Sequence, residues 1–211
     1  MAGLGIGPEV FALYRISDPE ARAVALEEAL TPTLLKIGGQ LTGGLSRVVG
    51  APMRVHPGKL PRRRGVAPEE TFVAFCPGEK GYRGIPHLTL AVTRAQLHAR
   101  VAVRAAADRG GAMRRTLQRE AGALAKKGRP FRRLRSYAEW DFQELPEIAP
   151  AHTQAFWIEL GEALARGGEA SGGIDVGIAW TAEEARNLAI GDVLGTYRDL
   201  SPLYKLLAGA R

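Results

Sequence analysis

The stretch Thr71-Phe-Val-Ala-Phe-Cys-Pro-Gly-Glu-Lys-Gly-Tyr-Arg-Gly-Ile-Pro-His-Leu-Thr-Leu-Ala-Val92 decides the fold of this chain. Two runs rich in β-branched and aromatic residues, 71–75 and 85–92, flank a loop that contains a proline and three glycines. Apolar runs separated by a glycine-containing turn are typical of a β-hairpin. Glycine permits positive φ angles, so the loop can turn while charged and aromatic side chains project from it. We therefore expect a hairpin with a basic tip, in which Cys76 lies opposite Ile85.

Two further segments have the alternation of β-strands. In residues 96–105 the aliphatic side chains fall on one face, and His98, Arg100 and Arg104 fall on the other. This pattern indicates a strand with one buried side and one polar, basic side. Residues 174–180 alternate in the same way, so we expect both segments to join the hairpin in one sheet.

Helical periodicity dominates the remaining sequence. Apolar residues recur at helical spacing in residues 19–49, after the capping sequence Ser17-Asp-Pro. Pro32 should bend this helix or restart it. The pattern as a whole predicts a single α+β domain over residues 1–211, with helices packed on an antiparallel or mixed sheet. Residues 1–17 are expected to form an N-terminal extension or a short helix.

Composition predicts a cytoplasmic protein that does not bind membranes. The 211 residues are 45% hydrophobic and 24% charged, which is ordinary for a globular protein. The single cysteine, Cys76, excludes an intrachain disulfide and fits a reducing compartment. No apolar run approaches the about 18–20 residues that a membrane span needs. Residues 1–8 lack the basic and long apolar parts of a signal peptide.

The chain lacks the sequence motifs of common catalytic and cofactor sites. It contains no GxxxxGK[ST] loop and no glycine fingerprint of a dinucleotide site. CxxC and HExxH are absent and the four histidines are scattered, so we expect no metal and no cofactor. Cys76 has no base placed to activate its thiol and is not expected to be a nucleophile. No catalytic residue can be assigned, and whether a reaction occurs stays open.

Positive charge is concentrated in the middle of the chain. The net charge is +7, and thirteen basic residues between 94 and 135 face only Asp108 and Glu120 there. This segment therefore carries +11 while the remainder sums to −4. Residues 54–64 add a second basic patch without acids. Clustered arginine and lysine favour a polyanion, and Tyr82, Phe131 and Tyr137 among them would suit exposed bases.

These charges predict binding of nucleic acid, DNA or RNA, mainly through backbone phosphates and with weak sequence preference. The candidate phosphate contacts are Arg100, Arg104, Arg114, Arg115, Arg119, Lys126, Lys127, Arg129, Arg132, Arg133 and Arg135.

A second interpretation stays open at the hairpin. Glycine amides beside basic side chains can hold a phosphate, so this end of the hairpin could bind a small anionic ligand such as a nucleotide. The residues of such a pocket would be His56, Arg63, Lys80, Tyr82, Arg83 and His87. A solvated hairpin tip without a ligand explains the same sequence.

The hairpin also resembles the signature of the YktB-like family, small bacterial proteins of unassigned function. The similarity rests on Phe72-Val-Ala-Phe, Pro77, Lys80-Gly-Tyr-Arg and Pro86-His, and extends to residues 19–49, His56, Arg62, Arg63, Leu203 and Tyr204. Cys76 departs from the family pattern, which has serine at this position. The resemblance implies an α+β sandwich of sheet and helices, similar in topology to biotin-ligase and class II synthetase domains. It implies no activity.

Overall fold

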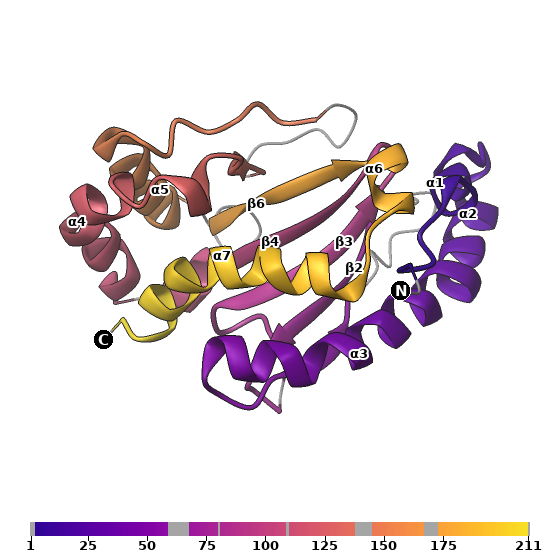
Figure 1. Cartoon of the computed structure of the whole chain (residues 1–211), viewed down its shortest axis with the longest axis horizontal. Coiled ribbons are helices and arrows are strands. Elements are labelled where there is room, and N and C mark those ends of the chain that lie inside the picture. Colours follow the sequence, from indigo (N-terminus) through magenta and orange to yellow (C-terminus); the bar gives the residue numbers. More distant parts are fainter. Residues whose placement is uncertain are drawn as a thin grey trace.

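The computed structural model describes residues 3–58, 68–79, 81–108, 110–137, 145–166 and 173–210. Six strands form one antiparallel sheet in the order β1-β2-β3-β4-β6-β5 (Figure 1). The strands are β1 Arg54–Pro57, β2 Glu70–Cys76, β3 His87–Thr93, β4 Gln96–Arg104, β5 Arg135–Ser136 and β6 Gly173–Thr181. The predicted α+β class is confirmed, and the sheet is antiparallel throughout.

Helices surround this sheet at one face and at both ends. They are α1 Pro8–Ala12, α2 Pro19–Ala25, α3 Thr31–Val49, α4 Ala112–Ala125, α5 Gln154–Arg166, α6 Ala182–Arg186 and α7 Ile190–Ala208. Figure 1 shows α3 and α7 side by side across the sheet, with α4 and α5 together at one end and α1 and α2 at the other. No helix of the described ranges combines the length and the apolar character that a membrane span requires.

The region predicted as one helix with a break at Pro32 is confirmed in that form. Asp18 caps α2 by accepting a hydrogen bond from the Ala21 backbone amide at 2.7 Å. A single π-helical turn, Leu26–Leu30, then joins α2 to α3, and Pro32 lies in the first turn of α3. Proline is tolerated there because the first amides of a helix have no intrahelical partner.

The hairpin forms, but its predicted register was wrong by two residues. Phe75 lies opposite Leu88 and Ala74 opposite Thr89, which places Cys76 across from His87 rather than Ile85. Side chains alternate with a period of two, so a two-residue shift leaves every residue on its expected face.

One face of the sheet builds the hydrophobic core with α3 and α7. Aliphatic and aromatic residues of β2, β3, β4 and β6 pack there against the buried leucines of both helices. Two tyrosines add polar ties across this interface. The Tyr14 hydroxyl donates to the Val92 carbonyl and the Tyr197 hydroxyl to the Thr89 carbonyl, each at 2.7 Å. The Tyr197 bond fixes α7 on β3, and the Tyr14 bond fixes the 3-10 turn Leu13–Arg15 on the same strand.

Candidate functional site

The other face of the sheet is polar, and it is buried as well. Thr89, His98 and Arg100 point to this side and are at most 3% exposed. The sequence had indicated a solvent-facing basic side for this strand, and that expectation was wrong. Arg100 in particular is not available at the surface for a phosphate, because its charge is held inside the protein.

Arg100 is the centre of a buried ion network. Its guanidinium contacts the Glu70 carboxylate through Nη2 and Asp175 Oδ2 through Nη1 at 3.1 Å, and its Nε donates to Thr89 Oγ1 at 3.4 Å. Glu70 lies on β2 and Asp175 on β6, in different rows of the ladder, so the Arg100 side chain on β4 connects three strands of the sheet. Removing such a charge from water is costly unless it is paired, and here two carboxylates pair with it.

Tyr137, just after β5, covers this network. Its ring stacks on His98 with centroids 5.0 Å apart and planes 17° from parallel. Arg100 Cζ lies 5.0 Å from the centroid of the same ring, within the range of a cation–π contact. The Tyr137 amide donates to the Asp175 carbonyl at 2.8 Å, which fixes the ring at this place.

Burial shifts the pKa of His98, Glu70, Asp175 and Arg100 in this network. Burial and the nearby Arg100 hold the pKa of His98 well below its usual value, so the imidazole 3.6 Å from Glu70 is neutral. Burial raises the pKa of Glu70 and of Asp175, although Arg100 opposes the rise in both. Burial lowers the pKa of Arg100, but Asp175 and Glu70 outweigh it and the net direction is upward. The guanidinium therefore stays charged.

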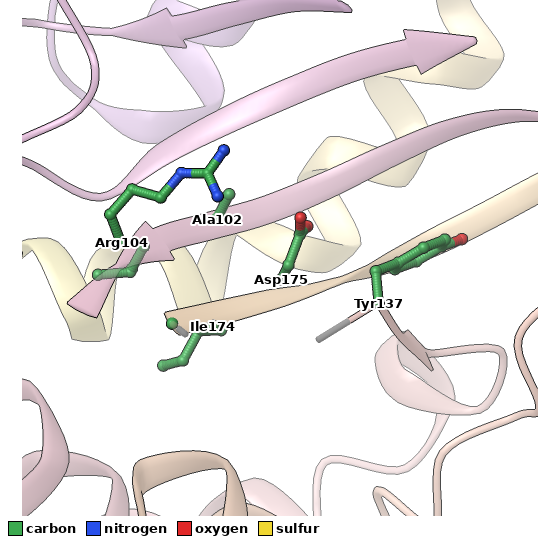
Figure 2. Close-up of a pocket in the computed structure, with 7 residues that line it drawn as sticks. Ala102, Arg104, Tyr137, Ile174 and Asp175 are labelled. Atoms are coloured by element: carbon green, nitrogen blue, oxygen red, sulfur yellow. The ribbon is translucent and has the colours of Figure 1, made fainter. Parts of the chain in front are cut away.

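A pocket of about 80 Å³ opens beside this network, where β4 ends and β6 begins. Its described lining residues are Ala102, Val103, Arg104, Tyr137, Gly173, Ile174 and Asp175. Figure 2 shows the Arg104 and Asp175 side chains rising from neighbouring strands toward the same side of the sheet, with the Tyr137 ring beyond Asp175. Arg104, predicted as a phosphate contact, is exposed and lies at this pocket.

The hairpin residues proposed for an anion pocket are placed differently from one another. Tyr82 is buried, with its ring 4.9 Å from that of His87, and His87 Nδ1 lies 3.0 Å from the Ile85 carbonyl oxygen. Burial lowers the pKa of His87 to about 4, so it is neutral near pH 7. His56 lies on β1 opposite Ala74, and Arg83 is exposed. Arg63 and Lys80 lie outside the described residues.

Cys76 is buried at the same end of the polar face. Its Sγ lies 3.8 Å from the Gly78 carbonyl oxygen, and burial raises the pKa of its thiol. A raised pKa disfavours the thiolate, which is the nucleophilic form. This environment agrees with the expectation that Cys76 is a packing residue.

The basic candidates after β4 divide between surface and interior. Helix α4 buries Met113, Leu117, Ala121 and Leu124, which turns its charged side outward. Seven of the predicted basic residues are exposed, and we call them the basic segment: Arg115, Arg119, Lys126, Lys127, Arg129, Arg132 and Arg133. The partly buried Arg135 instead donates to the Pro146 carbonyl oxygen, and Arg114 is half-buried.

Few acidic groups of the described residues contact the basic segment. Arg119 contacts Glu120 at 2.9 Å and Arg133 contacts Glu184 at 3.9 Å, and all four side chains are more than one third exposed. Exposed pairs of this kind contribute at most about 1 kcal/mol, so they leave the cations able to exchange partners. Phe131 and Tyr137 are buried, which corrects the expectation that they stack on bases.

No group of three or more His, Cys, Asp or Glu side chains is placed to hold a metal ion in the part of the chain that the structure describes.

The fold and the buried network define an α+β protein with an open antiparallel sheet that is apolar on one face and charged on the other. A family model described as "Domain of unknown function (DUF1054)" matches residues 8–204, and the chain belongs to this family. The resemblance found at the hairpin is therefore confirmed at the level of the family.

Relatives in other bacteria match about the same share of the chain. A UPF0637 protein of Bacillus licheniformis is 31% identical over 90 residues, which is 43% of each chain. One of Staphylococcus aureus is 30% identical over 90 residues, covering 43% of this chain and 44% of its own. A UPF0637 protein of Exiguobacterium sibiricum is 32% identical over 79 residues, which covers 37% of this chain and 39% of its own. The chain thus matches less than half the length of these relatives.

Proposed function

We propose that this protein binds nucleic acid through the basic segment, mainly by contacts to backbone phosphates. The observation that carries the proposal is the exposure of seven cations within residues 115–133, with Glu120 the one acid of that stretch. Arginine and lysine at such density attract the phosphate backbone and release its counterions. The single reduced thiol of Cys76 suits a cytoplasmic location for this role.

The arrangement of side chains also determines which parts of a nucleic acid the basic segment would contact. Arg115, Arg119 and Lys126 follow one another at helical spacing, so they share one exposed side of α4 and its C-terminal end. The rings of Phe131 and Tyr137 are buried, so neither of them supports base stacking. Phosphate contacts without base contacts give weak sequence preference and little advantage for single strands.

Fluorescence anisotropy with labelled double-stranded and single-stranded oligonucleotides tests this proposal. If about five phosphates are neutralised, the slope of log K against log salt on duplex DNA is about −4.5. Reversing the charge of Lys126, Arg129 and Arg132 to glutamate should then weaken binding on the order of a hundredfold at 0.1 M salt and flatten the slope.

The matched control reverses three exposed cations on the opposite part of the molecule. Arg15→Glu, Lys36→Glu and Arg47→Glu change the net charge equally but lie on the α1–α3 side. Retained affinity in this control assigns binding to the basic segment. Equal losses in both triple variants would show only a response to net charge, and absence of binding at low salt would refute the proposal.

The hairpin alternative has less support from geometry. Tyr82 and His87 pack against each other and are at most 5% exposed, so neither offers a free surface to a ligand.

A further inference from the structure

The pocket between the ends of β4 and β6 has no part in the proposed nucleic-acid contact. It lies on the polar face of the sheet, against the ion network, and its walls carry both signs of charge. Arg104 supplies a cation and Asp175 a carboxylate, from neighbouring strands. A pocket with one positive and one negative wall favours a ligand that carries both a negative and a positive group.

The two carboxylate oxygen atoms of Asp175 differ in their hydrogen bonding. Oδ2 accepts from Arg100 at 3.1 Å, which anchors the carboxylate. Oδ1 is shielded from solvent and has no hydrogen-bond partner among the residues that the structure describes. Native proteins rarely leave a buried acceptor unpaired. The Asp175 side chain is 26% exposed and lines the pocket, so this carboxylate has hydrogen-bonding capacity left for a donor that enters there.

Arg104 provides the complementary group. Its side chain is exposed, and it makes no ion pair within 4 Å with an acid of the described ranges. In Figure 2 its guanidinium extends to the side of the sheet on which the Asp175 carboxylate stands. The planar fork of a guanidinium binds a carboxylate with two parallel hydrogen bonds, so Arg104 favours a carboxylate-bearing ligand.

The backbone at the base of the pocket limits the ligand further. Gly173 has φ +143°, and a Cβ at this position would lie 2.1 Å from the Val103 carbonyl oxygen, so the two strands meet here without an intervening side chain. A volume of about 80 Å³ is roughly half that of the about 150 Å³ cavity that holds benzene. The pocket therefore suits a ligand of only a few non-hydrogen atoms.

We propose that this pocket binds a small free α-amino acid of the size of glycine or alanine, with its carboxylate on Arg104 and its ammonium group on the Asp175 carboxylate. A simple anion would leave Oδ1 without a donor and would be repelled by Asp175. A simple amine would leave Arg104 without an acceptor. Both charges of an α-amino acid are carried on adjacent carbon atoms, which matches two oppositely charged walls of one small pocket.

Isothermal calorimetry and thermal unfolding of the full chain with four probes test this assignment. Glycine should bind and raise the unfolding midpoint, whereas acetate and methylamine, each with one of its charges, should bind at least tenfold more weakly. Glycinamide, which keeps the amine and loses the carboxylate, should behave like methylamine. Acetate as strong as glycine would reduce the site to an anion site and overturn the proposal.

Variants locate the binding. Arg104→Gln removes an exposed charge but none of the direct contacts of the ion network, and it should weaken glycine binding at least tenfold. The matched control is Arg94→Gln, which lies at an exposed position in the turn that precedes β4, at the end of the strand away from the pocket. This variant should bind glycine as the parent does. Asp175→Asn tests the second wall, and its unfolding curve reports separately on any damage to the network. Glycine that fails to bind the parent, or that binds Arg104→Gln equally, refutes the assignment.

Discussion

Arg100 carries its charge inside the protein because three neighbours compensate for the loss of water. Glu70 and Asp175 supply opposite charge, and the face of the Tyr137 ring covers the guanidinium. Breaking a buried ion group by removing one partner typically costs about 3–5 kcal/mol, because the other charges remain without compensation. The network therefore commits this face of the sheet to one arrangement of side chains.

The neutral His87 makes stability depend on pH. Burial depresses its folded-state pKa to about 4 from 6.5, so the unfolded chain binds more protons between these values. The contribution of the neutral imidazole to the stability of the folded state is fully present above pH 6.5 and is lost as the pH falls toward 4. Between about pH 5 and 6, His87→Gln should lower the slope of unfolding free energy against pH by about 1 kcal/mol per pH unit.

Urea denaturation of both proteins across this pH range measures that difference. Glu70 and Asp175 have raised pKa values and contribute a slope of opposite sign, but they are present in both proteins and cancel in the comparison. His152→Gln, at an exposed position, controls for the loss of one histidine. Parallel slopes for the parent and His87→Gln would contradict a neutral His87 in the folded state.

The alternation of the sequence assigned the polar residues of β4 to the correct face of the sheet, but it could not show whether that face is exposed to solvent. His98 and Arg100 were placed on the polar face, and they lie there, yet both are buried. The partners Glu70 and Asp175 were not singled out at all. Acids within apolar strands on the same face as an arginine were the available signal, and only the strand register shows that they converge.

At the scale of elements, the packing of β4 against β6 leaves no room for a side chain at Gly177 of β6. A Cβ at Gly177 would lie 2.1 Å from the Ala99 carbonyl oxygen and 2.6 Å from Arg100 Cγ. Backbone atoms on a paired strand cannot move aside cheaply, so Gly177→Ala should destabilise the fold by about 3 kcal/mol.

Gly39→Ala on α3 is the contrasting substitution. Nothing lies within 4 Å of its added Cβ, and it is exposed on a helix, so the change should stabilise by about 0.5–1 kcal/mol. Chemical denaturation with equal m-values for the three proteins checks both signs. Gly177→Ala within 0.5 kcal/mol of the parent would mean that β4 and β6 separate without cost.

Helix boundaries were more predictable than strand pairing. Asp18 and Pro19 mark the start of α2 by local chemistry, and the capping box between Thr181 and Glu184 likewise marks α6. The hairpin register depends instead on how the loop after Cys76 packs over the sheet, where Tyr82 contacts Phe72 and His87. Period-two patterns specify a face, and contacts between distant residues specify the pairing.

At the scale of the whole molecule, charge is divided between interior and surface. The acidic groups Glu70 and Asp175 lie against Arg100 in the sheet, whereas the basic segment lies outside it on α4 and the turns that follow. Most of the basic residues that the sequence placed at the surface after β4 are exposed. Within β4, Arg104 at the end of the strand is exposed, but Arg100 is buried because the middle of the strand is covered on both faces.

The position of β6 between β4 and β5 has a consequence for the path of folding. Strands β1, β2 and β3 each pair with the next strand along the chain, but β4 pairs with β6, and only after the chain has closed a loop that contains α4 and α5. Closing a long loop costs entropy before any contact compensates for it, and β5 has no strand to join until β6 is in place. In pulsed hydrogen exchange during refolding, amides of β2 and β3 should gain protection before those of β6. If all six strands gained protection at the same time, the pairing of β4 with β6 would already be present in the rate-limiting step. Strands β1 to β4 would then not fold as a separate unit before β6 joins them.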